Sequence, residues 1–233
     1  MEQDKSVKRL YDLKSQQTLE TIDTLMQQGV DQMSVIIRHS DRHYHRDFRM
    51  EPFMGLTRAG KSYAHDMGAA FPAQITPQLY ASHFGRCIET AYLIDKGYTR
   101  ANGIELDHVQ TSDVLAPFYI KDIEKALGLM KDQGGKDFIR SWFDKKIATE
   151  IMEDPEKTAQ ILTDFMIECL DALSPGQIAV CASHDWNIFP IKEYKLGLDH
   201  EGAGDVGYLD GVVFYRDKGK PYAITYQTDP VAL

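Results

Sequence analysis

Apolar side chains recur every three to four positions over long stretches of the chain, which is the spacing of helices that bury one face. The first stretch, residues 2–29, predicts an amphipathic helix that stops at Gly29, with apolar positions at Val7, Leu10, Tyr11, Ile22, Leu25 and Met26. A second helix is expected over 56–71, where Thr57 is placed to cap the N-terminus. These helices need an apolar surface to pack against.

Two further helical regions follow along the chain. Residues 85–98 predict a helix that closes near Gly97. The pattern is helical again from about 115 to 173, with breaks at Gly134-Gly135 and at Asp154-Pro155. The second break also predicts a helix start, because aspartate suits the cap and proline suits the first turn.

Short runs of apolar and β-branched residues separate the helices and have the composition of buried strands. The clear ones are MSVII (33–37), QLYASH (78–83) and QIAVCAS (177–183), and a weaker one is expected at 107–112. VVFYR and YAITYQ, joined by DKGKP, predict a C-terminal hairpin. Strands that alternate with helices indicate an α/β fold with helices on both faces of the sheet. Since no linker, repeat or change of composition marks a boundary, residues 1–233 are expected to form a single domain with a helical insertion at about 115–173.

The composition of the chain limits the classes of partner that this domain is expected to bind. The 233 residues carry 26 basic and 35 acidic side chains, a formal net charge of −9, so nucleic acid or an anionic membrane would bind against the net field. No apolar run is long enough for a transmembrane helix, and the N-terminal segment lacks the apolar core of a secretory signal. The cysteines are odd in number and widely spaced, which is typical of reduced thiols: Cys87, Cys169 and Cys181. We therefore expect a cytoplasmic protein with no nucleic-acid or membrane partner.

Reactive polar residues stand at the end of each clear strand. The first strand is followed by Arg38, His39 and Arg42. The second ends in Ser82-His83, with Arg86 three residues later, and the third ends in Ser183-His184-Asp185. In open α/β sheets the ligand crevice lies beyond the carboxyl ends of the strands. If the three strands are parallel neighbours, these residues converge there: Arg38, Arg42, Arg86, His39, His184 and Asp185. Arginine forks match phosphate oxygens, so the pattern indicates a site for a dianionic phosphoryl group.

A histidine among guanidinium groups favours nucleophilic chemistry at phosphorus. Neighbouring positive charge disfavours the protonated ring, so His39 should be neutral and nucleophilic near neutral pH. Its attack would form a phosphoenzyme and divide hydrolysis into two easier steps. The departing oxygen then needs a proton, and Asp185 is the best-placed carboxyl, with Asp113 and Glu51 as substitutes. The arginines and His184 would stabilise charge on the equatorial oxygens.

Five segments, in the right order, resemble the histidine phosphatase superfamily, which includes acid phosphatases, phytases and cofactor-dependent phosphoglycerate mutases. RHSDR (38–42) resembles the family's RHGxR signature, ASHFGRCIETA (81–91) its second arginine block and ASHDWN (182–187) its second histidine block. LTRAGKSYAHDMG (56–68) and GYLDGVVF (207–214) resemble segments that the family carries at those places. The resemblance implies a three-layer α/β/α sandwich of the phosphoglycerate mutase-like type.

The resemblance also implies roles by position. His39 would be the nucleophile, and the phosphate pocket would be formed by Arg38, Arg42, Arg86 and His184. The mutase-like branch places a glutamate in a region that matches 111–119, where this chain has none. The acid phosphatase branch uses the aspartate of an HD pair, which Asp185 supplies, so that type of chemistry is favoured. Members of the family need no metal, and no cofactor is expected.

Three other residues are candidate substrate contacts. Asn187 matches the HDxN form of the acid phosphatase branch, and His83 lies beside a strand end. Ser40 stands where the family usually has glycine, and a side chain there would crowd the phosphate or distort the turn. Ser40 therefore supports one alternative, a catalytically silent protein that binds a phosphoryl ligand.

The stretch after the first strand also has the spacing of a metal site, through His39, His43 and His45. Four arginines crowd the same stretch and would repel a divalent cation: Arg38, Arg42, Arg46 and Arg49. We therefore expect no metal and place His43 and His45 at the pocket rim or on the surface. Cys87 follows an arginine that would activate its thiol, but burial is the favoured interpretation.

The sequence thus predicts a metal-independent phosphomonoesterase that hydrolyses a small phosphorylated substrate through a phosphohistidine on His39, with Asp185 as general acid. The alternatives are a phosphomutase or phosphotransferase on the same fold, against which the missing glutamate counts, and the silent binding protein. An inserted helical segment near strand ends is where leaving-group selectivity would lie. The sequence predicts neither a particular substrate nor an oligomeric state.

Overall fold

The computed structural model describes residues 2–233, with side chains from Ser15 onward apart from Phe48. Helix α1 (Glu2–Gln27) ends just before Gly29, whose φ of 89° lies in the left-handed region that glycine adopts without strain, so the predicted stop is confirmed. Ile22 and Leu25 are buried as the helical spacing requires, and the side chains of Val7, Leu10 and Tyr11 lie outside the described residues. Neither α1 nor any other helix in the described part of the chain is long and apolar enough to cross a bilayer.

The centre of the molecule is a seven-stranded mixed sheet with the order β3-β2-β4-β1-β5-β6-β7. β3, β2, β4 and β1 are parallel, whereas β5, β6 and β7 each run antiparallel to the strand before them in that order. The three clear strands, the weak strand and the hairpin are confirmed. Their bounds are β1 (Gln32–Arg38), β2 (Thr76–Ala81), β3 (Gln110–Thr111), β4 (Gln177–Ser183), β5 (Gly211–Asp217), β6 (Lys220–Ile224) and β7 (Val231–Ala232).

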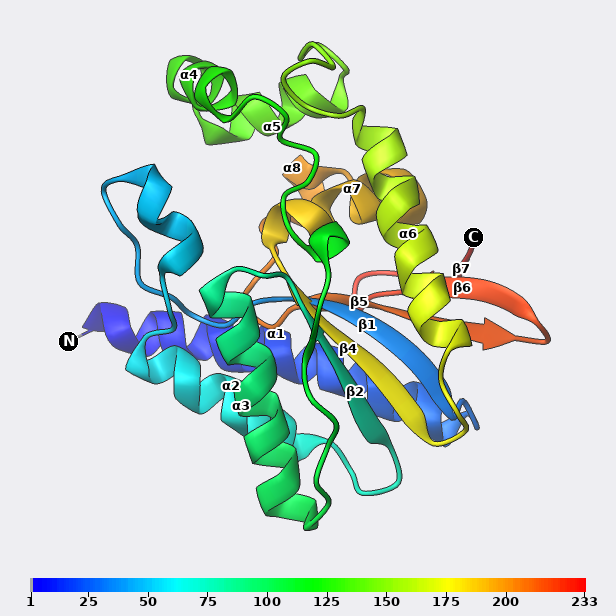
Figure 1. Ribbon diagram of the computed structural model, residues 1–233. Coiled ribbons are helices and arrows are strands. Elements are labelled where there is room, and N and C mark those ends of the chain that lie inside the picture. Colours follow the sequence, from blue (N-terminus) through cyan, green and yellow to red (C-terminus); the bar gives the residue numbers. More distant parts are fainter. Residues whose placement is uncertain (1) are drawn as a thin grey trace.

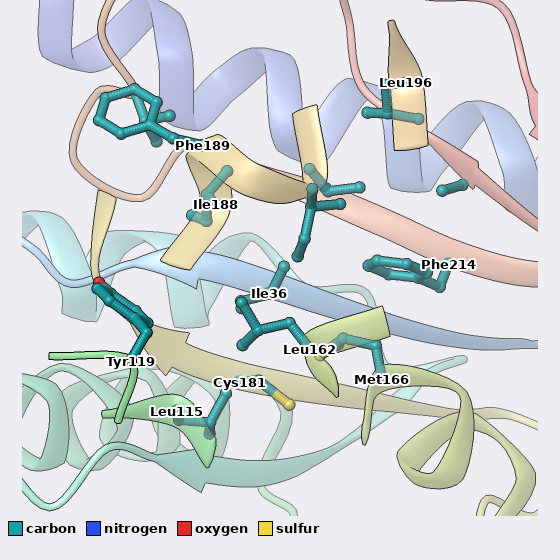
Figure 2. Close-up of a cluster of buried hydrophobic side chains, with 14 of the residues drawn as sticks. Ile36, Leu115, Tyr119, Leu162, Met166, Cys181, Ile188, Phe189, Leu196 and Phe214 are labelled. Atoms are coloured by element: carbon teal, nitrogen blue, oxygen red, sulfur yellow. The ribbon is translucent and has the colours of Figure 1, made fainter. Parts of the chain in front are cut away.

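Helices cover both faces of the sheet, because alternate strand residues point to opposite sides and both sides are apolar (Figure 1). On one side Val35 of β1 packs among α1, α2 and α3. On the other side Ile36 of β1 and Cys181 of β4 face residues of α6 and α7, the core shown in Figure 2. The predicted three-layer α/β/α sandwich is therefore confirmed. The covering helices are α2 (Arg58–Ala70), α3 (Gly85–Asn102), α6 (Pro155–Asp171) and α7 (Asp185–Leu196).

The helical region at about 115–173 divides into two parts. Its first part carries η2 (Asp113–Leu115), α4 (Ile123–Gln133) and α5 (Gly135–Phe143), and its two helices project at the end of the molecule where α7 and α8 (His200–Ala203) lie (Figure 1). Its second part is α6, which packs on the sheet: the Ser34 hydroxyl of β1 donates to the Met166 carbonyl at 2.7 Å. The apolar face of α6 is therefore part of the α/β/α sandwich.

Glycines allow α2 and α3 to cross with their backbones in contact. A Cβ added to Gly97 of α3 would lie 1.9 Å from the His65 carbonyl oxygen of α2, and one added to Gly68 of α2 would lie 2.0 Å from the Ile94 carbonyl oxygen. The prediction that α3 closes near Gly97 is wrong. The helix continues to Asn102 and ends at Gly103, whose φ is 69°. Gly97 serves the close approach of the helices and not the end of one.

Replacing Gly97 by alanine is expected to destabilise the protein by about 2–3 kcal/mol, since the methyl group forces the two helices apart. Urea unfolding of the variant and of wild type would measure the loss as a lower midpoint. The matched control is Gly128→Ala in α4, where an added Cβ meets nothing within 4 Å. That change should be neutral or stabilising by up to about 1 kcal/mol, because alanine favours the helix. Equal midpoints for Gly97→Ala and wild type would contradict the proposed packing role.

Candidate active site

The sheet brings the three reactive strand ends to one edge. β4 lies between β1 and β2 and is parallel to both, so Arg38 is in register with Ser183, and Ala81 with Ala182. The hydrogen bonds continue past the strands, because His39 N donates to the Ser183 carbonyl at 2.8 Å and Ser82 N donates to the Ala182 carbonyl at 2.9 Å. The residues that follow β1, β2 and β4 therefore converge as expected.

His39 is buried, and its Nδ1 lies 2.8 Å from the carbonyl oxygen of Ser40. A carbonyl only accepts, so Nδ1 carries the proton and Nε2 keeps its lone pair. Burial, with the neighbouring His184 and the positive charges of Arg86 and Arg38, lowers the pKa of His39 well below its ordinary 6.5. The ring is therefore a neutral imidazole whose Nε2 is ready to act as a nucleophile.

Arg38 is held from three sides. Its Nη2 lies 3.0 Å from Asp185 Oδ2, and its Nη1 donates to the Val206 carbonyl at 2.7 Å. Its guanidinium carbon lies 4.3 Å from the centroid of the Tyr208 ring, a cation–π contact. The same tyrosine ring lies 6.0 Å from the ring of His39. These contacts fix the guanidinium beside the candidate nucleophile.

Arg42 and Arg86 share a neighbour, Glu51 of the short helix η1 (Phe48–Phe53). Arg42 Nη1 pairs with the Glu51 carboxylate, and Arg86 Nη1 donates to the Glu51 carbonyl at 2.7 Å. Both guanidinium groups also lie over aromatic rings, Arg42 over Tyr44 at 3.9 Å and Arg86 over Phe84 at 4.8 Å from guanidinium carbon to ring centroid. The two arginines are thus oriented before any ligand binds.

The three site arginines still have unused donors. Among the described residues, the Nε–H groups of Arg38, Arg42 and Arg86 are buried and have no hydrogen-bond acceptor. A buried donor without a partner costs about 1–3 kcal/mol, and three of them at one edge of the sheet are an unfavourable arrangement by themselves. A tetrahedral oxyanion would supply the missing acceptors.

His184 lies edge-on to His39, with ring centroids 5.6 Å apart, and it is also buried. Arg86 Nη2 lies 3.3 Å from His184 Nδ1, and a guanidinium only donates, so Nδ1 accepts and Nε2 donates to Ser82 Oγ at 3.0 Å. Burial and the charges of Arg86, Arg42 and Arg38 lower the pKa of His184 well below 6.5. Both histidines are therefore neutral.

Cys87 is fully buried beside His184, with Sγ 3.6 Å from its Nε2. Burial raises the pKa of the Cys87 thiol to about 12, even though Arg86 is a neighbour. The prediction that Cys87 is a buried thiol is confirmed.

Asp185 begins α7 and is the accessible carboxylate of the site, with 28% of its side chain exposed. Its Oδ1 accepts from Trp186 N at 2.9 Å, while Oδ2 contacts Arg38. The carboxylate thus lies between the N-terminus of α7 and the guanidinium of Arg38.

Two of the candidate substrate contacts are fully buried and bonded within the fold. The Ser40 hydroxyl donates to the Gly60 carbonyl at 2.7 Å, so it turns toward α2. The Asn187 amide accepts from the Tyr119 hydroxyl at 3.1 Å and donates to the carbonyl of Ala116 at 3.2 Å. Both side chains hold neighbouring segments in place, and we assign them positioning roles.

The remaining candidates lie on the surface. His83 is half exposed, and its Nδ1 lies 3.2 Å from Asp113, whose side chain is 96% exposed. His43 and His45 are exposed as well. Within the described residues, no three His, Cys, Asp or Glu side chains are grouped so that they could hold a metal ion.

Sequence reasoning missed the roles of the aromatic residues. Tyr208 and Tyr44 stack on Arg38 and Arg42, and their hydroxyls lie 3.0 Å apart. Tyr208 lies in the segment GYLDGVVF, whose resemblance to the family marked the place without indicating a role for the ring.

Solved structures share this architecture over most of their length. Phosphoglycerate mutase from Bacillus anthracis is 18% identical, with a TM-score of 0.53, and the match covers 84% of this chain and 93% of that one. This chain has the phosphoglycerate mutase-like fold. A mycobacterial glucosyl-3-phosphoglycerate phosphatase solved with inorganic phosphate is 15% identical, with a TM-score of 0.53, over 85% and 100% of the chains. YhfR from Bacillus stearothermophilus is 15% identical, with a TM-score of 0.56, over 83% and 95%.

The shared fold is the one that the sequence motifs led us to expect. No family model matches the chain. No curated protein matches it either. The similarity at this level of identity concerns the fold, and the chemistry must be argued from the site.

Proposed function

We propose that this phosphoglycerate mutase-like protein is a phosphomonoesterase that works without a metal through a phosphohistidine on His39. One observation carries the proposal: Arg38, Arg42 and Arg86 have buried, unused Nε–H groups at the sheet edge where His39 is neutral and keeps the lone pair of Nε2. A phosphoryl group would supply acceptors for those donors and place phosphorus near Nε2. A structural ion-pair cluster would leave no reason for three unsatisfied donors at one place.

The proposed reaction has two displacements at phosphorus. His39 Nε2 attacks and forms an N–P bond while the bond from phosphorus to the ester oxygen breaks, and Asp185 gives that oxygen its proton. A water molecule then attacks the phosphohistidine, with Asp185 accepting its proton, and the N–P bond breaks to release phosphate and restore the imidazole. Arg38, Arg42 and Arg86 would stabilise the charge on the equatorial oxygens in both steps.

The assignment of Asp185 as the acid rests on a comparison of the carboxyl groups. Asp113 faces solvent and pairs with His83, and the carboxylate of Glu51 is bound to Arg42. Asp185 lies beside Arg38 and is partly open to solvent, as proton exchange requires. The HD pair and this position together support acid phosphatase-like chemistry over the mutase type.

The substrate we propose is a small phosphorylated molecule. Neighbours in fold include a phosphoglycerate mutase and a glucosyl-3-phosphoglycerate phosphatase, so transfer to an acceptor is the main rival activity. The silent binding protein finds no support in the geometry, because the Ser40 hydroxyl that suggested it points to the Gly60 carbonyl.

The test is release of inorganic phosphate from an activated aryl phosphate in the presence of a metal chelator. Free phosphate should form with multiple turnovers, and an added alcohol acceptor should capture little of it. Transfer of most of the phosphoryl group to the acceptor would favour the transferase, and activity that disappears in chelator would contradict the metal-free reaction.

Asp185→Asn is expected to lower kcat by about 10²–10³-fold for an alkyl phosphate, because the amide cannot protonate a poor leaving group. The loss should be much smaller for a nitrophenyl phosphate, whose leaving group departs without a proton. Initial rates with the two substrates would measure the difference. Asp113→Asn is the matched control, and a leaving-group-dependent loss in that variant instead would identify Asp113 as the acid.

A further inference from the structure

The chain between β1 and α2 forms a closed loop over the site. His43 N donates to the Gly55 carbonyl at 3.0 Å, and Arg42 and Leu56 form a β-bridge, so the two ends of residues 43–55 are tied together. We call residues 43–55 the 43–55 loop. It carries η1 and stands out from the body of the molecule beside α2 (Figure 1).

Glu51 is the residue of the 43–55 loop that contacts both Arg42 and Arg86. Only 7% of this residue is exposed. One carboxylate oxygen pairs with Arg42 Nη1, and the other accepts from His45 N at 3.0 Å within the loop. The backbone carbonyl of the same residue accepts from Arg86. A single residue thus occupies donors on two of the three arginines that we assign to the phosphoryl group.

A carboxylate and a phosphoryl group compete for the same kind of donor. Both accept N–H bonds from a guanidinium, so the one Glu51 oxygen that pairs with Arg42 Nη1 takes a donor that a phosphate oxygen would also use. A dianion bound beside an ionised carboxylate would be repelled strongly in a buried site. Ligand binding and the Arg42–Glu51 contact therefore oppose each other.

The loop is built so that Glu51 can withdraw without loss of the fold. Phe53 is 73% exposed and Met50 is 39% exposed, so these two apolar side chains of η1 contribute little to the core. The tied ends stay anchored, because Leu56 N donates to Glu89 Oε2 at 2.7 Å. The contact between the hydroxyls of Tyr44 and Tyr208 holds the loop from its other side.

We propose that Glu51 is an internal anion that occupies Arg42 in the free protein and that a phosphoryl ligand must displace it. This inference rests on the proposed function, since it concerns the same pocket. Glu51 lowers the affinity of the pocket for every oxyanion, so that only a ligand with further contacts binds well. The 43–55 loop moves outward with Glu51 when the ligand enters.

The test is the binding of inorganic phosphate to the full chain, measured by calorimetry for wild type, Glu51→Gln and Asp113→Asn. Glu51→Gln keeps the size of the side chain and removes its charge, and it should bind phosphate about tenfold more tightly. Asp113→Asn removes one charge at the same sheet edge with no arginine contact, and it should change the affinity less than about threefold. Phosphate binding that is unchanged or weaker in Glu51→Gln would overturn the proposal.

A second variant reports the movement of the loop. Phe53→Trp places an exposed indole on η1, and its fluorescence, after subtraction of the wild-type signal from Trp142 and Trp186, should change on addition of phosphate. No change while calorimetry shows binding would contradict the displacement of Glu51. If wild type and Glu51→Gln both fail to bind phosphate, the proposed function itself is contradicted, which distinguishes the two failures.

Discussion

Replacing His39 by alanine is expected to abolish release of phosphate, with a fall in kcat of about 10⁴-fold or more. The methyl group cannot form the N–P bond, and loss of an enzyme nucleophile has effects of this size. Phosphate should still bind, because the three arginines are held by residues other than His39. Initial rates on an activated aryl phosphate, together with phosphate calorimetry, would measure both quantities.

The control for this variant is His108→Ala, which removes an exposed histidine outside the site. It should retain the wild-type rate. Equal rates for wild type and His39→Ala would mean that the activity arises from another nucleophile, and the proposed mechanism would then be wrong.

Arg86→Met should lower kcat/KM by about 10²–10³-fold, because the change removes a buried guanidinium that we propose stabilises charge on the phosphoryl oxygens. Arg86 also donates to His184 and to the Glu51 carbonyl, so its removal disturbs both groups. Arg86→Lys should recover only part of the rate, since an ammonium cannot reproduce the planar fork.

Steady-state kinetics with a matched surface variant would measure the effect of Arg86. Arg49→Met is suitable, because that side chain is 89% exposed and contacts Asp47 on the surface. Full recovery by Arg86→Lys would show that charge alone matters, and a rate equal to that of Arg49→Met would remove Arg86 from the reaction.

The layers of the fold are predictable because each buried element carries its own periodicity. Ile36 and Val35 face opposite sides of the sheet, and both sides are apolar, so the strand reads as a continuous hydrophobic run. Gly97 is a case in which the sequence pattern does not distinguish two structural roles. A glycine that permits a close helix crossing looks the same in sequence as one that ends a helix, and only the position of His65 on the partner helix separates them.

The residues at the strand ends are predictable for a different reason. Parallel strands deliver whatever follows them to one edge, so His39, Arg86 and His184 could be placed together before their distances were known. The residues that contact the arginines could not be predicted in this way. The contact between Tyr44 and Tyr208 joins residues 164 positions apart, and Glu51 lies in a loop without hydrophobic periodicity.

The hydrogen bond from His39 Nδ1 to the Ser40 carbonyl has a consequence for the intermediate. Phosphorylated imidazoles exist as two regioisomers, and the proton held on Nδ1 leaves only one of them accessible here. The phosphoryl group would be carried on Nε2, and the ring would keep its orientation while the N–P bond forms and breaks. Each turnover would therefore return the imidazole in the tautomer with which it began, with no rotation of the ring between cycles.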